Sequence, residues 1–115
     1  MAVGAKIVKI NLEAGMPTIE VALRNLVNRL STCKGQGTKA AIVVHGYGSS
    51  GVGGGIRLAV RKKLKEPSLV GMIRAVCPGE EWVNRREDLI RECTFLRDYD
   101  REIMSNAGVT VVLFK

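Results

Sequence analysis

Two segments of strand character joined by an amphipathic helix constrain the fold of this chain more than any other feature. Residues 6–12 alternate and are rich in β-branched side chains, and residues 40–44 form a continuous apolar run typical of buried parallel strands. Between them, after Thr18 as a helix N-cap, apolar residues recur at helical spacing over 18–32. Because such crossovers are right-handed, the two strands are parallel and end at the same edge of one sheet.

The rest of the chain predicts a second helix and two further strands. We expect a helix over 56–65 that is ended by Pro67, a strand over 69–77 and a last strand over 109–114. The charged insert, about 83–106, fits one or two short helices or a long ordered loop. The sequence therefore predicts a single α/β domain over 1–115, a two-layer sandwich with a four-stranded mixed sheet and two helices on one face.

Composition excludes several classes of protein. A chain of 115 residues with 46% hydrophobic and 25% charged residues is typical of one globular domain. No stretch of about 18 apolar residues occurs, and the first residues lack an apolar leader, so we expect neither a membrane span nor a secretory signal. The three cysteines are widely spaced and the chain has one histidine, which predicts free thiols in a reducing cytoplasm and no metal site.

Positive charge is concentrated in the first two thirds of the chain. Residues 1–79 carry a net charge of +9 and residues 80–102 a net charge of −3, within a total of +7. A basic body favours a polyanionic partner such as nucleic acid, although a generic basic surface is the alternative.

The shared edge of the parallel strands brings the candidate site residues together. Glu13 follows the first strand and His45 the second, and ligands of open α/β sheets gather at that edge. Six of the thirteen glycines lie within 46–55, where backbone N–H groups and the next helix N-terminus can approach phosphate oxygens. We expect sequence-independent contacts to a nucleic-acid backbone from Gly46, Tyr47, Gly48, Arg57, Arg61, Lys62 and Lys65.

Each of these features has a structural alternative. The glycine-rich loop over 46–55 could be only a flexible connection, and His45 could be a buried residue that donates to a backbone carbonyl. Likewise, Tyr47 could be an ordinary surface aromatic, and the basic residues of the second helix could form only a solvated helix face. Residues 46–51 match the dinucleotide pattern GxGxxG, but no acidic residue ends a strand about 20 residues later. No Gly-Lys-Ser/Thr follows the glycines either, so we expect no small-molecule cofactor.

Several segments of the chain resemble the Smr (small MutS-related) domain family. Residues 45–48, His-Gly-Tyr-Gly, match the family's HGxG motif, residues 55–60 are similar to the helix that follows it, and residues 108–113 are similar to its closing strand. The resemblance implies a fold like the C-terminal domain of translation initiation factor 3. It also implies nucleic-acid binding and, in several members, endonuclease cleavage of DNA or RNA.

The chain departs from the family at its first motif. Where members carry LDxH, residues 12–15 read Leu-Glu-Ala-Gly, so Gly15 replaces the histidine. We therefore expect a nucleic-acid-binding domain with weak or absent endonuclease activity. If it cleaves, His45 and Glu13 are the catalytic candidates, and Mg²⁺ or Mn²⁺ is the candidate cofactor. The alternative is a protein-interaction or ribosome-docking module, which the acidic segment 80–102 and Trp82 suggest.

Overall fold

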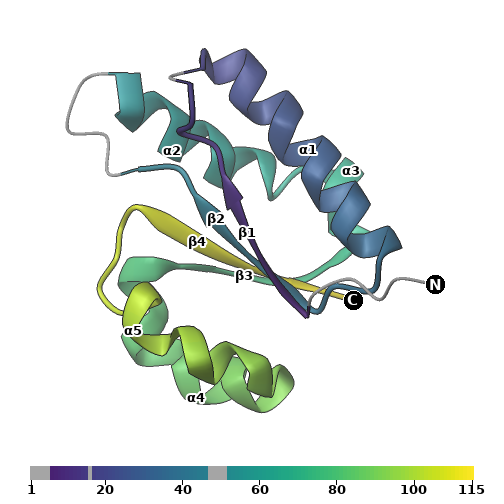
Figure 1. Ribbon diagram of the computed structural model, residues 1–115, viewed down its shortest axis with the longest axis vertical. Helices are drawn as coiled ribbons and strands as arrows, with labels where there is room; N and C mark the ends of the chain where they lie inside the picture. The colour runs from purple at the N-terminus through teal and green to yellow at the C-terminus, as the bar shows by residue number, and fades with distance from the viewer. Residues whose placement is uncertain (1–5, 16, 47–51) are drawn as a thin grey trace.

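The computed structural model describes residues 6–15, 17–46 and 52–115, in which a four-stranded mixed sheet is the central feature (Figure 1). Its strands are β1 (Ile7–Asn11), β2 (Ala40–Val44), β3 (Ile73–Pro78) and β4 (Val109–Phe114), in the order β1-β2-β4-β3. β1 and β2 are parallel, and β4 is antiparallel to both β2 and β3. The first three strands therefore end at one edge, where β4 begins. We call this edge, formed by residues 11–13, 45–46, 78–80 and 106–110, the carboxyl-end rim.

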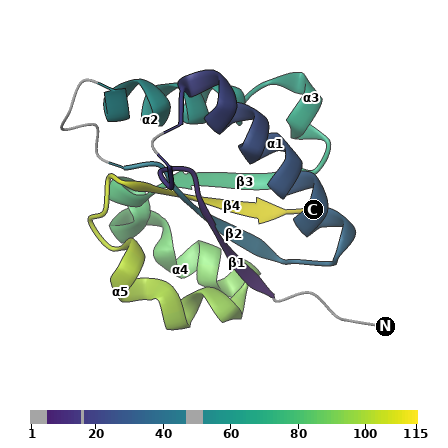
Figure 2. The same cartoon turned by 45° about the horizontal axis from the view of Figure 1, so that its top comes forward.

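The first face of the sheet is covered by α1 (Ile19–Gly35), α2 (Val52–Lys63) and the short α3 (Pro67–Val70) (Figures 1 and 2). Thr18 is the N-cap of α1, since its Oγ1 accepts from the backbone N–H of Val21 at 3.2 Å. The apolar face of α1 packs with Val43 of β2 and Val60 of α2 into one core. The predicted α/β sandwich, with two main helices on one face of a mixed sheet, is confirmed.

The second helix begins earlier than predicted. α2 starts at Val52, four residues before position 56, so glycines interpreted as loop residues belong to its first turn. Close packing explains the glycine at position 55, because a Cβ there would lie 2.8 Å from Cδ1 of Ile19 at the start of α1. The absence of a side chain at Gly55 lets the two helices approach closely at their N-termini.

The third strand begins later than predicted. The strand expected over 69–77 starts only at Ile73, because residues 67–70 form α3. Pro67 lies at the start of α3, where its fixed φ suits a helix and its missing N–H costs no hydrogen bond. Leu69 is buried against the first-face core, which explains its apolar character without a strand.

The charged insert forms a second helical layer on the opposite face of the sheet (Figure 2). This layer comprises η1 (Gly79–Glu81), α4 (Trp82–Glu92), η2 (Thr94–Tyr99) and α5 (Asp100–Ile103), so it begins four residues before the predicted position 83, and the insert is taken below as residues 79–106. Trp82, Leu96 and Ile103 are fully buried and pack in a cluster with Ile42 of β2 and Val111 of β4. The insert therefore completes the second of the two hydrophobic clusters of the described chain, against the strands of the sheet.

Ion pairs join this acidic insert to the basic body. Arg61 of α2 pairs with Glu80 at 2.7 Å, Lys9 of β1 with Glu102 at 2.5 Å, and Arg74 of β3 with Glu92. The exposed pairs among them each contribute about 0–1 kcal/mol. The charge separation along the sequence is thus partly satisfied inside the molecule.

Two further observations concern the cysteines and the helices. Cys33, Cys77 and Cys93 are free, as predicted, and all three are buried. Within the described residues, no helix combines the length and the apolar character needed to cross a bilayer.

Candidate functional site

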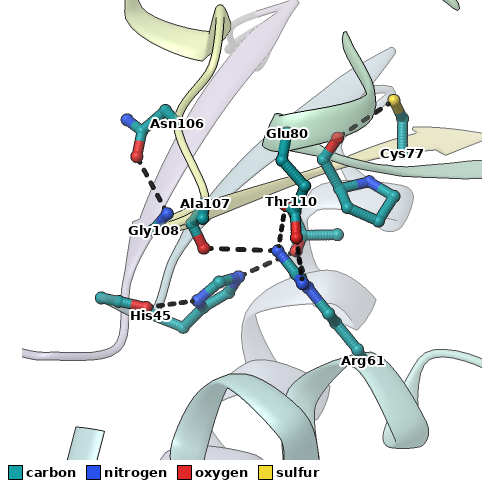
Figure 3. Close-up of polar contacts among 10 residues, drawn as sticks. His45, Arg61, Cys77, Glu80, Asn106, Ala107, Gly108 and Thr110 are labelled. Carbon is teal, nitrogen blue, oxygen red and sulfur yellow. Dashed lines mark hydrogen bonds and ion pairs between the residues drawn. The ribbon is translucent and has the colours of Figure 1, made fainter. Parts of the chain in front are cut away.

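The carboxyl-end rim brings together residues from four segments that are far apart in the sequence. His45 and Gly46 follow β2, Glu80 follows β3, and the turn at 106–108 leads into β4 (Figure 3). The backbone N–H groups of His45 and Gly46 both donate to the carbonyl oxygen of Gly108 at 3.0 Å. The end of β2 is therefore fixed against the start of β4.

His45 is fully buried and both of its ring nitrogens have protein partners. Nδ1 lies 3.1 Å from the carbonyl oxygen of Gly46, and Nε2 lies 2.8 Å from Oγ1 of Thr110 (Figure 3). Because a carbonyl only accepts, we assign the proton to Nδ1, which leaves Nε2 to accept from the Thr110 hydroxyl. In this arrangement neither ring nitrogen is free to activate a water molecule.

Arg61 continues the same hydrogen-bond chain. Its Nε donates to Thr110 Oγ1 at 3.3 Å, and one terminal nitrogen donates to the Ala107 carbonyl at 3.3 Å. The two terminal nitrogens also donate to the two carboxylate oxygens of Glu80 at 2.8 and 2.7 Å, a bidentate pair. Arg61 thus links α2 to β4 and η1, and its charge is largely matched by Glu80.

Burial and neighbouring charges shift the pKa values of this network. Removal from water lowers the pKa of His45 from 6.5 to about 4, and the positive charges of Arg61 and Arg57 act in the same direction. The hydrogen bond from Arg61 holds the pKa of Glu80 below its usual value. The imidazole is therefore neutral and the carboxylate charged at neutral pH.

The lowered pKa of His45 predicts a stability that falls on mild acidification. The unfolded chain protonates this imidazole near pH 6.5 and the folded protein only near pH 4, so between these values the unfolded state binds more protons. We expect the free energy of unfolding to drop by about 1.5 kcal/mol between pH 6.5 and pH 5 from this residue. Urea unfolding at both pH values measures it. In His45→Gln most of this drop should vanish; an unchanged pH dependence would contradict the assignment.

Gly46 and Glu13 are neighbours at the rim. Gly46 has a φ of +83°, a conformation that glycine adopts without steric cost. A Cβ at this position would lie 2.5 Å from Oε2 of Glu13, so the carboxylate rests against the glycine. The partners of the imidazole are nevertheless Gly46 and Thr110 rather than Glu13. The structure brings the two catalytic candidates to one rim without joining them by a hydrogen bond.

The predicted basic stripe divides into residues of different character, and its last member, Lys65, lies just beyond α2, which ends at Lys63 instead of the predicted position 65. Arg57 is half-buried, and its Nε is shielded from water without a hydrogen-bond partner in the described part of the chain. Arg61 is engaged by Glu80, whereas Lys62 and Lys65 are exposed. Tyr47 and Gly48, also predicted contacts, lie outside the described residues. Arg57, Lys62 and Lys65 are therefore the cations of the stripe without an acidic partner among the ion pairs of the described chain.

Sequence reasoning missed Thr110 and Glu80. Thr110 is the one polar residue of β4, and it is fully buried. A lone polar residue in an otherwise apolar strand can indicate a buried side chain that makes a specific hydrogen bond. Glu80 comes two residues after β3, and β3 ends at the same rim as β1 and β2. Extending the strand-end argument to the third strand would have identified it.

Comparison with models of known families, with curated proteins and with solved structures finds no match for this chain. Within residues 6–15, 17–46 and 52–115, no group of three or more His, Cys, Asp or Glu side chains is placed to hold a metal ion.

Proposed function

We propose that this chain is a nucleic-acid-binding domain of Smr type that holds the phosphate backbone at the carboxyl-end rim without reading sequence. Arg57 is the observation that carries the proposal. Its buried Nε lacks a protein partner in the described chain, and its charge acts on His45 at the rim. It also belongs to the N-terminal half of α2, which carries the positive end of the helix dipole. A phosphate oxygen there would give the guanidinium its missing acceptor.

The state of His45 favours binding over cleavage. General-base catalysis needs a nitrogen within hydrogen-bond reach of the attacking water. Both nitrogens of His45 are engaged by Gly46 and Thr110, and the ring is 0% exposed. We therefore propose that this histidine orders the rim as a positioning residue and that binding does not depend on hydrolysis.

Matched charge variants on the two faces of the molecule test the proposal. We expect Lys62→Glu/Lys65→Glu to weaken binding of single- or double-stranded oligonucleotides at least tenfold and to reduce the slope of log affinity against log salt by about 2. Arg57→Gln should reduce the slope by about 1. Fluorescence anisotropy over a salt series measures both quantities.

The control is Arg97→Glu/Arg101→Glu, which changes the net charge equally on the face formed by the insert, where both arginines are exposed. This variant should bind within about threefold of the parent. Equal losses in both double variants would mean that only overall charge matters, and affinity independent of salt would contradict backbone binding altogether.

Two exposed apolar side chains favour a protein-docking module as the second candidate function. Val83 of α4 is 54% exposed and Phe95 of η2 is 47% exposed, both on the insert. A protein partner that is retained after nuclease treatment, but lost in Val83→Ser/Phe95→Ser, would favour docking over nucleic-acid binding.

A further inference from the structure

A cavity of about 240 Å³ lies at the edge of the sheet opposite to the carboxyl-end rim. Thr38 and Lys39, just before β2, line it together with Phe114 at the end of β4, Arg74 of β3 and Cys93 after α4. Drug-sized ligands occupy pockets of about 300–1,000 Å³, so this cavity suits a smaller group.

The lining of the cavity is strongly positive. Its basic side chains are Lys34, Lys39, Arg74 and Lys115, and its one acidic side chain is Glu92. Glu92 is paired with one terminal nitrogen of Arg74, and Lys34 donates to the backbone carbonyl of Lys115. Lys39 has no acidic partner among the described ion pairs, and Arg74 keeps its other nitrogens for a further acceptor.

Thr38 is the independent observation that points to a ligand. The residue is 3% exposed and lines the cavity, yet its Oγ1 has no hydrogen-bond partner among the described protein atoms. Its backbone N–H donates to the carbonyl of Cys33 at 3.0 Å, which fixes the residue in place. Because buried hydroxyl groups are nearly always hydrogen-bonded, the unpartnered oxygen indicates a partner outside the described protein atoms.

We propose that this cavity binds a phosphate group through Lys39, Arg74 and the Thr38 hydroxyl. A phosphate monoester carries a charge of about −1.5 to −2 at neutral pH and several acceptor oxygens, which complements clustered cationic donors and one hydroxyl. The group comes either from free phosphate or from the phosphorylated end of a nucleic acid. This cavity lies at the edge of the sheet opposite to the carboxyl-end rim, so phosphate binding here can be tested independently of the proposed nucleic-acid binding through Arg57.

Titration with inorganic phosphate at constant ionic strength tests the site. In ¹H–¹⁵N NMR spectra we expect saturable shifts at the amides of Thr38, Lys39, Arg74 and Cys93. Thr38→Val and Lys39→Gln should each weaken binding about tenfold, since each removes a hydrogen bond to a charged group. Arg97→Gln removes an exposed cation from η2, outside both proposed sites, and should leave the affinity unchanged. Because Thr38 Oγ1 has no partner among the described protein atoms, Thr38→Val should keep the thermal midpoint of the phosphate-free protein.

Short oligonucleotides with a 5′-phosphate or a 5′-hydroxyl identify the source of the group. If the parent protein binds the 5′-phosphate oligonucleotide more tightly than the 5′-hydroxyl one, and Thr38→Val and Lys39→Gln remove this difference, the site is supported and its ligand is the end of a nucleic acid. Saturation by inorganic phosphate alone, lost in the same variants, supports the site for free phosphate. Shifts that chloride reproduces, or that Thr38→Val and Lys39→Gln leave unaltered, would overturn the proposal. Lys39→Gln should not alter Arg57-dependent binding of unphosphorylated oligonucleotides, which separates this site from the proposed function.

Discussion

Gly79→Ala is expected to lower the free energy of unfolding by about 3 kcal/mol. Gly79 is buried at the junction of β3 and η1, and a Cβ there would overlap the carbonyl oxygen of Asn106. It would also lie 2.9 Å from both the carbonyl carbon of Asn106 and Cγ2 of Val109. Two of these three atoms are backbone, so no side-chain rotation can relieve the overlap, and the turn at 106–108 must move. Chemical denaturation followed by circular dichroism measures the loss.

Gly71→Ala is the matched control for this substitution. Gly71 has a φ of −61° and nothing within 4 Å of its hypothetical Cβ, so alanine should be neutral or stabilise by up to about 1 kcal/mol. If both variants unfolded at the same denaturant concentration, close packing of Gly79 against the 106–108 turn would be refuted. Because Ala107 of this turn accepts from Arg61, Gly79→Ala should also disturb the His45 network.

Trp82→Ala is expected to cost about 3–5 kcal/mol, because it removes the largest side chain of the second-face core. Trp82 is 0% exposed, and its Nε1 donates to Oδ1 of Asp100 at 2.8 Å. Asp100 also accepts from Nε of Arg86 at 2.7 Å. The indole therefore both fills the core and ties the start of α4 to the start of α5.

Trp82→Phe separates these two roles. It keeps most of the apolar volume and removes the indole donor, so we expect a smaller loss, about 1–2 kcal/mol. The Arg86 guanidinium and the Trp82 indole together hold the pKa of Asp100 below its usual value. Trp82→Phe removes one of these two donors, so it should raise the pKa of Asp100 part of the way back to that value, and NMR titration can follow the change.

Val83→Ala is the control, because Val83 is the sequence neighbour of Trp82 and is 54% exposed, and it should change the free energy of unfolding by less than about 0.5 kcal/mol. A Trp82→Ala loss no larger than that of Val83→Ala would contradict the structural role of the insert.

The insert therefore belongs to the folding unit. Its removal would expose Ile42, Val111 and Leu113, which are almost completely buried on the second face of the sheet. Point variants on the exposed surface of the insert, such as those at Val83, Phe95 and Arg97, are the appropriate way to test whether it docks a partner.

Much of the fold could be predicted because its central elements show clear periodicity. The apolar run at 40–44 and the last strand at 109–114 have the predicted bounds, and Thr18 caps α1 as expected. The start of α2 could not be predicted, because three successive glycines look like a loop unless the contact between Gly55 and Ile19 is known. The helices of the insert were also ambiguous, because their buried residues are widely spaced among charges that turn out to pair with the body.

The position of the candidate site could be predicted from the sequence, but the burial of His45 and the pairing of Arg61 could not. Parallel strands end at one edge, so the meeting of Glu13 with the His45–Gly46 pair followed from topology. That His45 would be 0% exposed depends on Thr110 and Arg61, which are 65 and 16 positions away in the sequence. Likewise, the neutralisation of Arg61 by Glu80 depends on long-range packing, which periodicity does not encode.

The position of β4 has a consequence for how the protein assembles during synthesis. This strand comes last in the sequence but pairs with β2 on one side and β3 on the other, and all six of its residues are buried. Until it has left the ribosome, β3 has no partner strand and the layer formed by the insert has no complete sheet to cover. The β1–α1–β2 unit and α2, which packs on it, have their partners earlier, whereas the complete sheet and the layer of the insert have to wait for β4. We therefore expect cooperative structure to arise in a late step after translation of residues 109–114.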